Sequence, residues 1–566
     1  MRATTEAKIL AGEQRPRLAA DPNLGAGNFL HYAVLANSQR DLPLLWLERP
    51  YRAASGEVFS TLSLTELKSL VDRMAGFYHR VGVRPRDPIG VFVEEGVESF
   101  VHLMALTALG AIAIMINSDQ KPEIAAGCLR RIGAVGAFLE PAREVAVRAH
   151  LGADVETLRF IAGPAAAAAL GGELPARYPY AHAADDVCYL CHSSGTTGLP
   201  KAVIMSHAQH FVGARRRLGA AEFNESDRIL SMMPHTHAVG IAHFIFAIVS
   251  GTPFAIVSDA SARSVIAAIE AFRPAMVLGF SRTYAELAEL DLEGYDLSSV
   301  ERWFNTADSA HEKHIRAIVK HGSHPEGSKR APGSSFIDML GSSEMALPVF
   351  QKVHTWNSNA YGRAVGKPNP IVEAAVLDPH GTPLGPHCVG RIAVKSPATT
   401  AGYWNNSLAT CQRRQSGYWL MDDLGYRDEE GVYYHVDRVG DEIKTPRGDV
   451  YTLPIEEIIM QTHPEVLDTF VIAMRTTGPY AEPLAIAYLA AGSTLTEGGL
   501  LDLFNERLRA SGQPALARVV IATSRAECPV GPTGKVIKHA LRDRFDSRRT
   551  PPALVAAPAA TDGVSP

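Results

Sequence analysis

The sequence predicts an α/β protein of at least two domains, in which parallel or mixed sheets are covered by helices. Length is the first reason, because 566 residues exceed what one hydrophobic core ordinarily serves. Alternation is the second, since strand-like apolar stretches at 88–93 and 111–116 flank a helical stretch at 99–109. Strands that alternate with helices along a chain are typical of a parallel sheet buried on both faces.

The composition argues against nucleic acid and membranes as partners. Apolar residues make up 46% of the chain and charged residues 20%, as in soluble globular proteins. The formal net charge of −5 provides no general attraction to nucleic acid or to anionic lipid. The apolar stretch at 103–116 is too short to span a membrane, and His243 and Pro253 interrupt the one at 238–257. We therefore expect neither a nucleic-acid partner nor a membrane span.

Cysteine usage favours a reducing, cytoplasmic location. The chain has six cysteines, and Cys188 and Cys191 form an isolated Cys-x-x-Cys pair. No second pair accompanies it, and it lies on a predicted strand, so we expect buried free thiols rather than a metal or redox site.

Local signals predict several further elements. Ser-Leu-Thr-Glu at 63–66 and Ser-His-Ala-Gln at 206–209 resemble capping boxes that begin helices, the second of which would run towards Leu218. Glycines and prolines at 323–335 predict a loop. We expect residues 1–26 to be a loosely held arm and the Pro- and Ala-rich residues 546–566 to be disordered.

The stretch at 193–201, Ser-Ser-Gly-Thr-Thr-Gly-Leu-Pro-Lys, predicts a loop that holds phosphate between two strands. Glycines allow close backbone approach, and hydroxyls with consecutive N–H groups wrap phosphate oxygens. It is not a Walker loop, because two residues separate the last glycine from the lysine and a strand follows. The candidate phosphate ligands are Ser193, Ser194, Gly195, Thr196, Thr197, Gly198 and Lys201.

Two further strand ends carry chemistry-bearing side chains. A strand at 229–233 leads into Pro-His-Thr-His-Ala-Val-Gly, which contains His237. A strand at 336–340 leads into Gly-Ser-Ser-Glu, and we expect Glu344 beside the phosphates to hold Mg²⁺, because hard cations take oxygen ligands.

These motifs together resemble the adenylate-forming (ANL) superfamily, which includes acyl-CoA synthetases, peptide-synthetase adenylation domains and luciferases. The resemblance extends from about Phe59 to Arg542. It implies a large N-terminal domain over residues 27–438, with the ATP and acyl sites, and a small mobile α+β domain over residues 439–545.

The resemblance also implies roles for individual residues. The catalytic set would be Lys535, Glu344 and Lys201, with Lys535 as the family's catalytic lysine. Beyond the phosphate loop, nucleotide contacts would come from Thr306, Ala307, Asp308, Gly341, Ser342, Ser343, Asp423 and Arg438. The acyl pocket would draw on His237, Gly240, Gly279, Phe280 and Met345. The hinge and the coenzyme A side would include Gly440, Asp441, Arg447 and Gly448.

Five positions depart from the family's pattern. Thr306 stands in place of a glycine beside the adenine, and Ser343 in place of a threonine. Met421 and Asp422 replace the threonine and glycine before Asp423, which we interpret as an altered turn that keeps the ribose-binding carboxylate. Gly440 occupies a hinge position that is usually Asp or Lys, and glycine there should ease rotation of the small domain.

The resulting hypothesis is a cytoplasmic acyl-CoA ligase. With ATP and Mg²⁺ it would convert a small carboxylic acid to an acyl-adenylate and transfer the acyl group to coenzyme A, releasing AMP. Three alternatives stay open: a thioester-forming enzyme that uses acyl-adenylate from a partner enzyme, an enzyme that loads a carrier protein or acts like a luciferase, and a nucleotide-binding protein without turnover. The sequence predicts neither the acid nor the oligomeric state.

Overall fold

The structure is a computed structural model. It describes residues 7–10, 13–170, 172–193, 199–220, 227–306, 310–327, 329–358, 362–475, 478–531 and 535–544. The chain divides into a larger unit, Met1–His435 with Gly531–Lys535, and a smaller unit, Val436–Val530 with Val536–Pro566. Each unit has hydrophobic clusters of its own.

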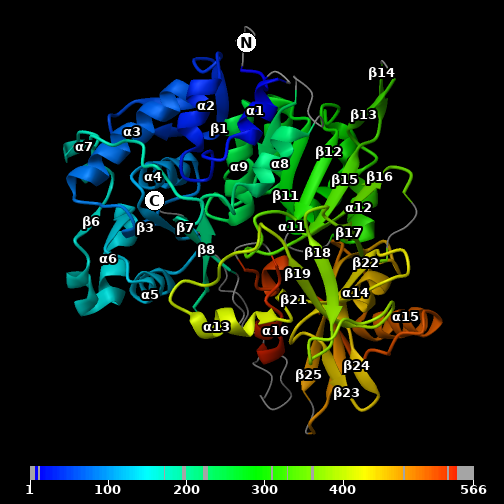
Figure 1. Cartoon of the computed structure of the whole chain (residues 1–566). Coiled ribbons are helices and arrows are strands. Elements are labelled where there is room, and N and C mark those ends of the chain that lie inside the picture. Colours follow the sequence, from blue (N-terminus) through cyan, green and yellow to red (C-terminus); the bar gives the residue numbers. More distant parts are fainter. Residues whose placement is uncertain are drawn as a thin grey trace, which may run out of the picture. The chain divides into compact units, whose positions relative to one another are not determined.

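A six-stranded sheet forms one part of the larger unit, in the order β6-β5-β3-β4-β7-β8. The strands are β3 (Pro88–Phe92), β4 (Ile112–Met115), β5 (Gly136–Leu139), β6 (Phe160–Ala162), β7 (Val187–His192) and β8 (Ala202–Ser206). All neighbouring pairs are parallel except β7 with β8. Figure 1 shows helices around this sheet, among them α3 (Leu64–Arg80), α4 (Val97–Ala108), α5 (Pro122–Ile132) and α6 (Pro141–Leu151).

A 14-stranded mixed sheet forms the rest of the larger unit. Its order is β18-β19-β21-β22-β17-β16-β15-β12-β11-β9-β10-β1-β2, with β20 paired to β21. The parallel part contains β9 (Ile229–Ser231), β10 (Phe254–Ile256), β11 (Met276–Phe280), β12 (Arg302–Thr306) and β15 (Ser335–Leu340). The other strands are β1 (Pro43–Arg52), β2 (Val58–Ser63), β16 (Phe350–Thr355), β17 (Ala364–Pro368), β18 (Glu373–Leu377), β19 (Gly390–Lys395), β20 (Arg414–Gln415), β21 (Tyr418–Arg427) and β22 (Tyr433–Arg438).

The larger unit contains further helices besides those around the six-stranded sheet. They are α1 (Gln14–Ala20), α2 (Phe29–Ala36), α7 (Pro164–Leu170), α8 (Val212–Gly219), α9 (Ala238–Ser250), α10 (Ala262–Phe272), α11 (Ser281–Ala288), α12 (Glu312–Ile318) and α13 (Ser407–Gln412). The predicted α/β class with mixed sheets and helical cover is confirmed. Among the described residues, no helix is both long and apolar enough to cross a membrane.

The smaller unit is α+β. Strands β25 (Val466–Arg475), β26 (Ala481–Leu489) and β27 (Arg518–Ala522) form one sheet, and β23 (Ile443–Thr445) and β24 (Gly448–Val450) form a hairpin. Its helices are α14 (Thr452–Met460), α15 (Glu497–Ala510) and α16 (Lys538–Arg544). Lys538, whose side chain is 11% exposed, donates to Thr452 and Glu456 at 2.7 Å each, which attaches α16 to α14. Gly440 has φ +90°, a backbone angle that favours glycine.

Two local predictions were wrong. Ser206 donates its N–H to Gln209, but α8 begins only at Val212 because Ser206 still pairs with Val187 in the β7–β8 ladder. Residues 323–335 are not a loop, since β13 (Ser323–Glu326) and β14 (Lys329–Pro332) form an antiparallel hairpin. Both strands of a two-stranded hairpin are edge strands, and edge strands tolerate prolines such as Pro325 and Pro332.

The expectation of a loosely held N-terminal arm does not fit its described residues. Leu24 and Ala26 are fully buried. The Arg215 guanidinium donates to the main-chain carbonyl oxygens of Ala19 and Asp21 at 2.6 Å each. Burial and these bonds anchor the segment to the larger unit. Residues 545–566 lie outside the described residues.

Six buried or half-buried histidines make the larger unit sensitive to acid. Burial is the largest cause that lowers each pKa, to about 4 or about 3, from an unfolded value near 6.5. They are His31, His192, His207, His210, His237 and His243. The folded form holds them neutral, so their contribution to stability is complete above about pH 6.5 and falls as the pH decreases towards 4.

We therefore expect the unfolding free energy of the larger unit to fall between pH 7 and pH 5. Each histidine contributes up to about 1.4 kcal/mol per pH unit within that range. All five tryptophans lie in the larger unit, so urea titrations followed by tryptophan fluorescence report its unfolding. An unfolding midpoint that is the same at pH 7 and pH 5 would contradict this prediction.

Candidate active site

The predicted phosphate loop joins two strands, as the sequence indicates. β7 and β8 pair antiparallel from Val187 with Ser206 to His192 with Ala202. The loop is closed at its base, where the Ser193 N–H donates to the Lys201 carbonyl at 3.0 Å. The Arg131 guanidinium donates to the carbonyl oxygens of Leu199 and Pro200. The predicted ligands Ser194, Gly195, Thr196, Thr197 and Gly198 lie outside the described residues.

Lys201 lies at the end of this loop in a strongly charged environment. Its Nζ is 5.1 Å from the centre of the Tyr403 ring. Burial lowers the pKa of the Lys201 ammonium, and the positive charge of Arg413 lowers it further, while Asp422 and Glu344 oppose this. The loop lysine and the predicted metal ligand therefore lie close together.

Glu344 follows β15 and is only 7% exposed. The Tyr403 hydroxyl donates to its Oε1 at 2.7 Å, and its main-chain carbonyl accepts from the Thr400 N–H at 2.8 Å. These bonds hold the carboxylate beside Lys201. An oxygen ligand anchored in this way fits Mg²⁺, and Glu344 is the residue that would hold it.

Asp423 is buried on β21, so the residues before it do not form a turn and that interpretation was wrong. β21 continues through Met421 and Asp422, where its antiparallel ladder with β19 is irregular between Leu420 and Leu424. The Asp423 carboxylate lies 3.2 Å from the Nε2 of buried His435. A buried carboxylate at this position suits the two hydroxyls of a ribose.

Asp422 and Arg413 form a bidentate pair that the sequence analysis missed. Both guanidinium nitrogens of Arg413 donate to the two Asp422 oxygens. Arg391 donates from Nε to the Met421 carbonyl at 2.7 Å and lies 3.4 Å from Asp422. This pair raises the pKa of Arg413, although burial of the guanidinium acts against it. The sequence signal for it was an aspartate where the resembled motif has a glycine.

The residues assigned to the acyl pocket serve different purposes. His237 is the N-cap of α9, and its ring lies 6.1 Å from the Phe280 ring, edge to face. Gly240 is required by packing, because a Cβ there would lie 2.5 Å from the Pro234 carbonyl oxygen. At Gly279 a Cβ would lie 2.8 Å from Met232 Cε, the end of a flexible side chain, so packing restricts that position less.

Of the predicted residues after β15, Ser343 lies close to His237. Met345 is buried, and its sulfur accepts from the Thr399 hydroxyl at 3.5 Å. Ser343 Oγ lies 3.5 Å from His237 Nε2, within the turn that follows Gly341 and Ser342. Thr306 ends β12 and is buried. Ala307 and Asp308 lie outside the described residues.

Lys535 belongs to the larger unit together with His237. The Gly531 N–H donates to the Lys535 carbonyl at 2.8 Å. Burial lowers the pKa of His237 to about 4, and the positive charge of Lys535 acts in the same direction.

The remaining predicted residues lie in the smaller unit. The Arg438 N–H donates to Asp437 at 2.9 Å, and Arg542 binds Asp441 at 2.9 Å. Pro446 and Arg447 form the β23–β24 turn, and Gly448, the first residue of β24, has φ +115°. Their roles in catalysis stay predictions.

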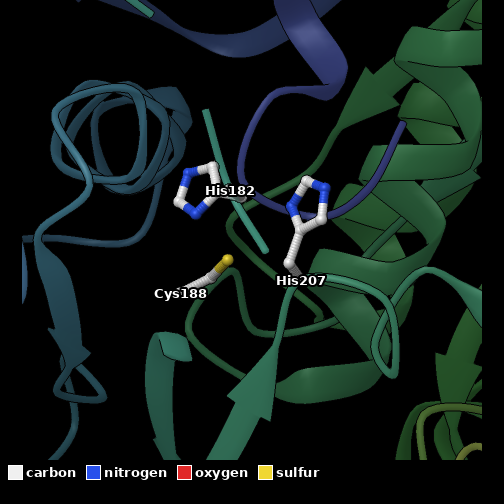
Figure 2. Close-up of side chains that lie close together, drawn as sticks. All are labelled: His182, Cys188 and His207. Carbon is white, nitrogen blue, oxygen red and sulfur yellow. The ribbon is translucent and has the colours of Figure 1, made fainter. Parts of the chain in front are cut away.

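A separate cluster of potential metal ligands consists of His182, Cys188 and His207 (Figure 2). Their ligand atoms lie within 4.8 Å of one another. However, His207 Nδ1 accepts from the Gly27 N–H and its Nε2 donates to the Asn23 carbonyl, at 3.1 Å each. The cluster then offers two ligand atoms, fewer than the three or four of a protein zinc site. Its hydrogen bonds anchor the N-terminal segment.

The sequence profile described as AMP-binding enzyme matches residues 48–404, which contain the phosphate loop, Glu344 and Tyr403. The chain belongs to the AMP-binding enzyme family. It is an enzyme of the ANL superfamily, as the motifs predicted, and the family contains ATP-dependent, AMP-forming acid–thiol ligases.

Curated relatives cover nearly the whole chain. It is 38% identical over 558 residues to the 3-aminoavenalumate diazotase of a Streptomyces species, which covers 95% of this chain and 99% of that one. It is 24% identical to the long-chain-fatty-acid–CoA ligase FadD13 of Mycobacterium tuberculosis, over 86% of this chain and 93% of that one. A 2-succinylbenzoate–CoA ligase of Bacillus mycoides is also 24% identical, over 82% and 89%.

Solved structures agree on the fold. An anthranilate CoA ligase in complex with anthranoyl-AMP superposes with a TM-score of 0.80 at 20% identity, over 94% of this chain and 99% of that one. The O-succinylbenzoate CoA synthetase of Bacillus subtilis, in complex with ATP and magnesium ion, has a TM-score of 0.76 at 20% identity, over 91% and 99%.

The Tyr403–Glu344 bond predicts a Mg²⁺-specific defect. Tyr403→Phe removes the hydroxyl that orients Glu344, so we expect the Mg²⁺ concentration for half-maximal ATP-dependent activity to rise by about 10-fold. A matched control is Trp404→Phe, because that indole donates instead to Ile132 at 3.0 Å. Titration of Mg²⁺ at saturating ATP measures this concentration for both variants. An unchanged Mg²⁺ requirement in Tyr403→Phe would contradict the assignment of Glu344 as a metal ligand.

Proposed function

We propose that this protein activates an acid with ATP as an adenylate and then transfers the activated group to an aromatic amine. The identity of 38% with a diazotase along almost the full length of both chains is the observation that carries the choice of amine. The site residues described above support the first step, and the similarity to the diazotase supports the second.

The first half-reaction brings an anionic acid to a polyanionic nucleotide, so it needs positive charge and positioning. Lys201 and Glu344-bound Mg²⁺ would offset the phosphate charge, and Asp423 would hold the ribose. Lys535 would bridge the acid and the α-phosphate. An acid oxygen attacks the α-phosphorus, the bond to the β-phosphate oxygen breaks, and pyrophosphate leaves.

The second half-reaction follows from what a diazotase must do. Conversion of an aryl amine to a diazonium group adds one nitrogen at the oxidation level of nitrite, so the acid to be activated would be nitrous acid. The amine nitrogen attacks the nitrosyl nitrogen of nitrosyl-AMP, the N–O bond to AMP breaks, and AMP leaves with one proton released. The N-nitrosamine takes up that proton and loses water, so no oxidant or reductant is consumed.

A second candidate is the acyl-CoA ligase that the sequence predicted. The CoA-ligase names of relatives at 24% identity favour it. It shares the adenylation step and differs in the nucleophile, which would be the thiol of coenzyme A. A thioester-forming enzyme supplied with adenylate by a partner, and a carrier-loading enzyme, would differ again in the acceptor.

One assay separates these functions. The protein is incubated at pH 8 with ATP, Mg²⁺, nitrite and 3-aminoavenalumate, and AMP release is measured alongside azo coupling of the product to 2-naphthol. We expect AMP and coupled dye only when ATP, nitrite and amine are all present. Lys201→Ala should reduce both signals by about 100-fold, since it removes charge that stabilises the transition state.

Parallel reactions replace nitrite with coenzyme A. Thioester formation from an aryl or fatty acid, together with no dye in the nitrite reaction, would favour the ligase. ATP binding without AMP release for any combination would contradict adenylation itself.

A further inference from the structure

Glu95 connects loops that follow strands of two different sheets. It lies three residues after the carboxyl end of β3, and His235 lies four residues after that of β9. The His235 N–H donates to Glu95 Oε2 at 2.8 Å, and His235 Nδ1 lies 2.9 Å from the same oxygen. Ser118, beyond the end of β4, donates to Oε1 at 3.3 Å. Through one carboxylate, the loop after β3 thus bonds to the loops after β4 and β9.

This carboxylate remains charged although it is largely buried. Its side chain is 17% exposed. Burial acts to raise the pKa of Glu95, but the neighbouring His235 overcomes this and lowers the pKa below its usual value. His235 itself is 2% exposed and its ring packs against Phe100, 5.1 Å away. His235 is therefore enclosed, and it does not reach a substrate.

The residue that Glu95 positions is His237, two residues further on. His237 caps α9, where its Nδ1 accepts the Val239 N–H at 3.3 Å. A neutral imidazole that accepts at Nδ1 carries its proton on Nε2. That Nε2 lies 3.5 Å from Ser343 Oγ, and the His237 ring lies beside the Phe280 ring. The N–H thus points towards the candidate site.

We infer that Glu95 is a positioning residue, which holds the His235–His237 loop so that His237 presents a neutral Nε2–H donor to an oxygen of the bound acid. The inference rests on the proposed activation of an acid with ATP. Charged groups that act on His237 are Glu95 and Lys535, and neither accepts its Nε2 proton in the hydrogen bonds described here. A neutral donor binds the acid oxygen without taking up a proton from it.

A double-mutant cycle tests this assignment. Glu95→Ala should lower kcat/KM for the acid by about 10- to 100-fold, because a small displacement of a positioned group has that cost. The KM for ATP should not change. In a His237→Phe background, Glu95→Ala should cost less than about 3-fold, because the donor that it positions is already absent. Glu95→Gln should restore most of the activity, since its amide oxygen still accepts the His235 N–H.

The neighbouring acid supplies a matched control. Glu94→Ala removes the same charge from the same loop, but Glu94 is exposed, so it should leave kcat/KM for the acid within about 2-fold. The inference would be overturned if Glu95→Ala lowered kcat/KM for the acid equally in both backgrounds. It would also be overturned if Glu94→Ala lowered kcat/KM as much as Glu95→Ala does.

A crystal structure of Glu95→Ala tests the same claim without any turnover. We expect the His237 ring to leave the Val239 N–H, and its Nε2 to move away from Ser343 Oγ. An unchanged His237 in that variant would overturn the inference even if no acid substrate is found. Failure of the proposed function would instead appear as no AMP release in the wild-type protein.

Discussion

The contact between Glu95 and His235 ties together the carboxyl ends of β3 and β9, which belong to different sheets. Parallel α/β sheets bind ligands at the carboxyl ends of their strands, so a site built from two sheets needs their ends held in register. The isolated bridge between Val203 and Tyr403 provides a second connection, next to the phosphate loop. His237 follows β9, Lys201 precedes β8, and Glu344 accepts a hydrogen bond from Tyr403.

Charge is organised around the same region. Lys201 and Arg413 are cations close to one another, and Asp422 occupies both nitrogens of the Arg413 fork. Arg413 is therefore held in place by its own partner, and Lys201 is left as the cation of the phosphate loop beside Glu344. This division lets one lysine face a polyanion while a nearby arginine stabilises the β19–β21 region.

Site residues that lie in a local sequence motif could be predicted from the sequence. Those whose role depends on a partner distant in the sequence could not. The phosphate loop, Glu344, Asp423 and His237 each stand at a strand end or in a recognisable motif. Tyr403 and Glu95 have no local signal, because each is defined by a partner far along the chain, at Glu344 and His235. Asp422 was interpreted as part of a turn because its neighbours resemble one, but it lies within β21, at an irregularity in the ladder with β19.

The central claim is that an acid oxygen attacks the α-phosphorus of ATP, and isotope transfer tests it most directly. The protein is incubated with ATP, Mg²⁺, the aryl amine and ¹⁸O-labelled nitrite, and the products are analysed by mass spectrometry. The account predicts one ¹⁸O atom in each AMP formed and none in pyrophosphate, because cleavage of the N–O bond leaves the acid's oxygen on phosphorus. Unlabelled AMP, or label in pyrophosphate, would contradict it.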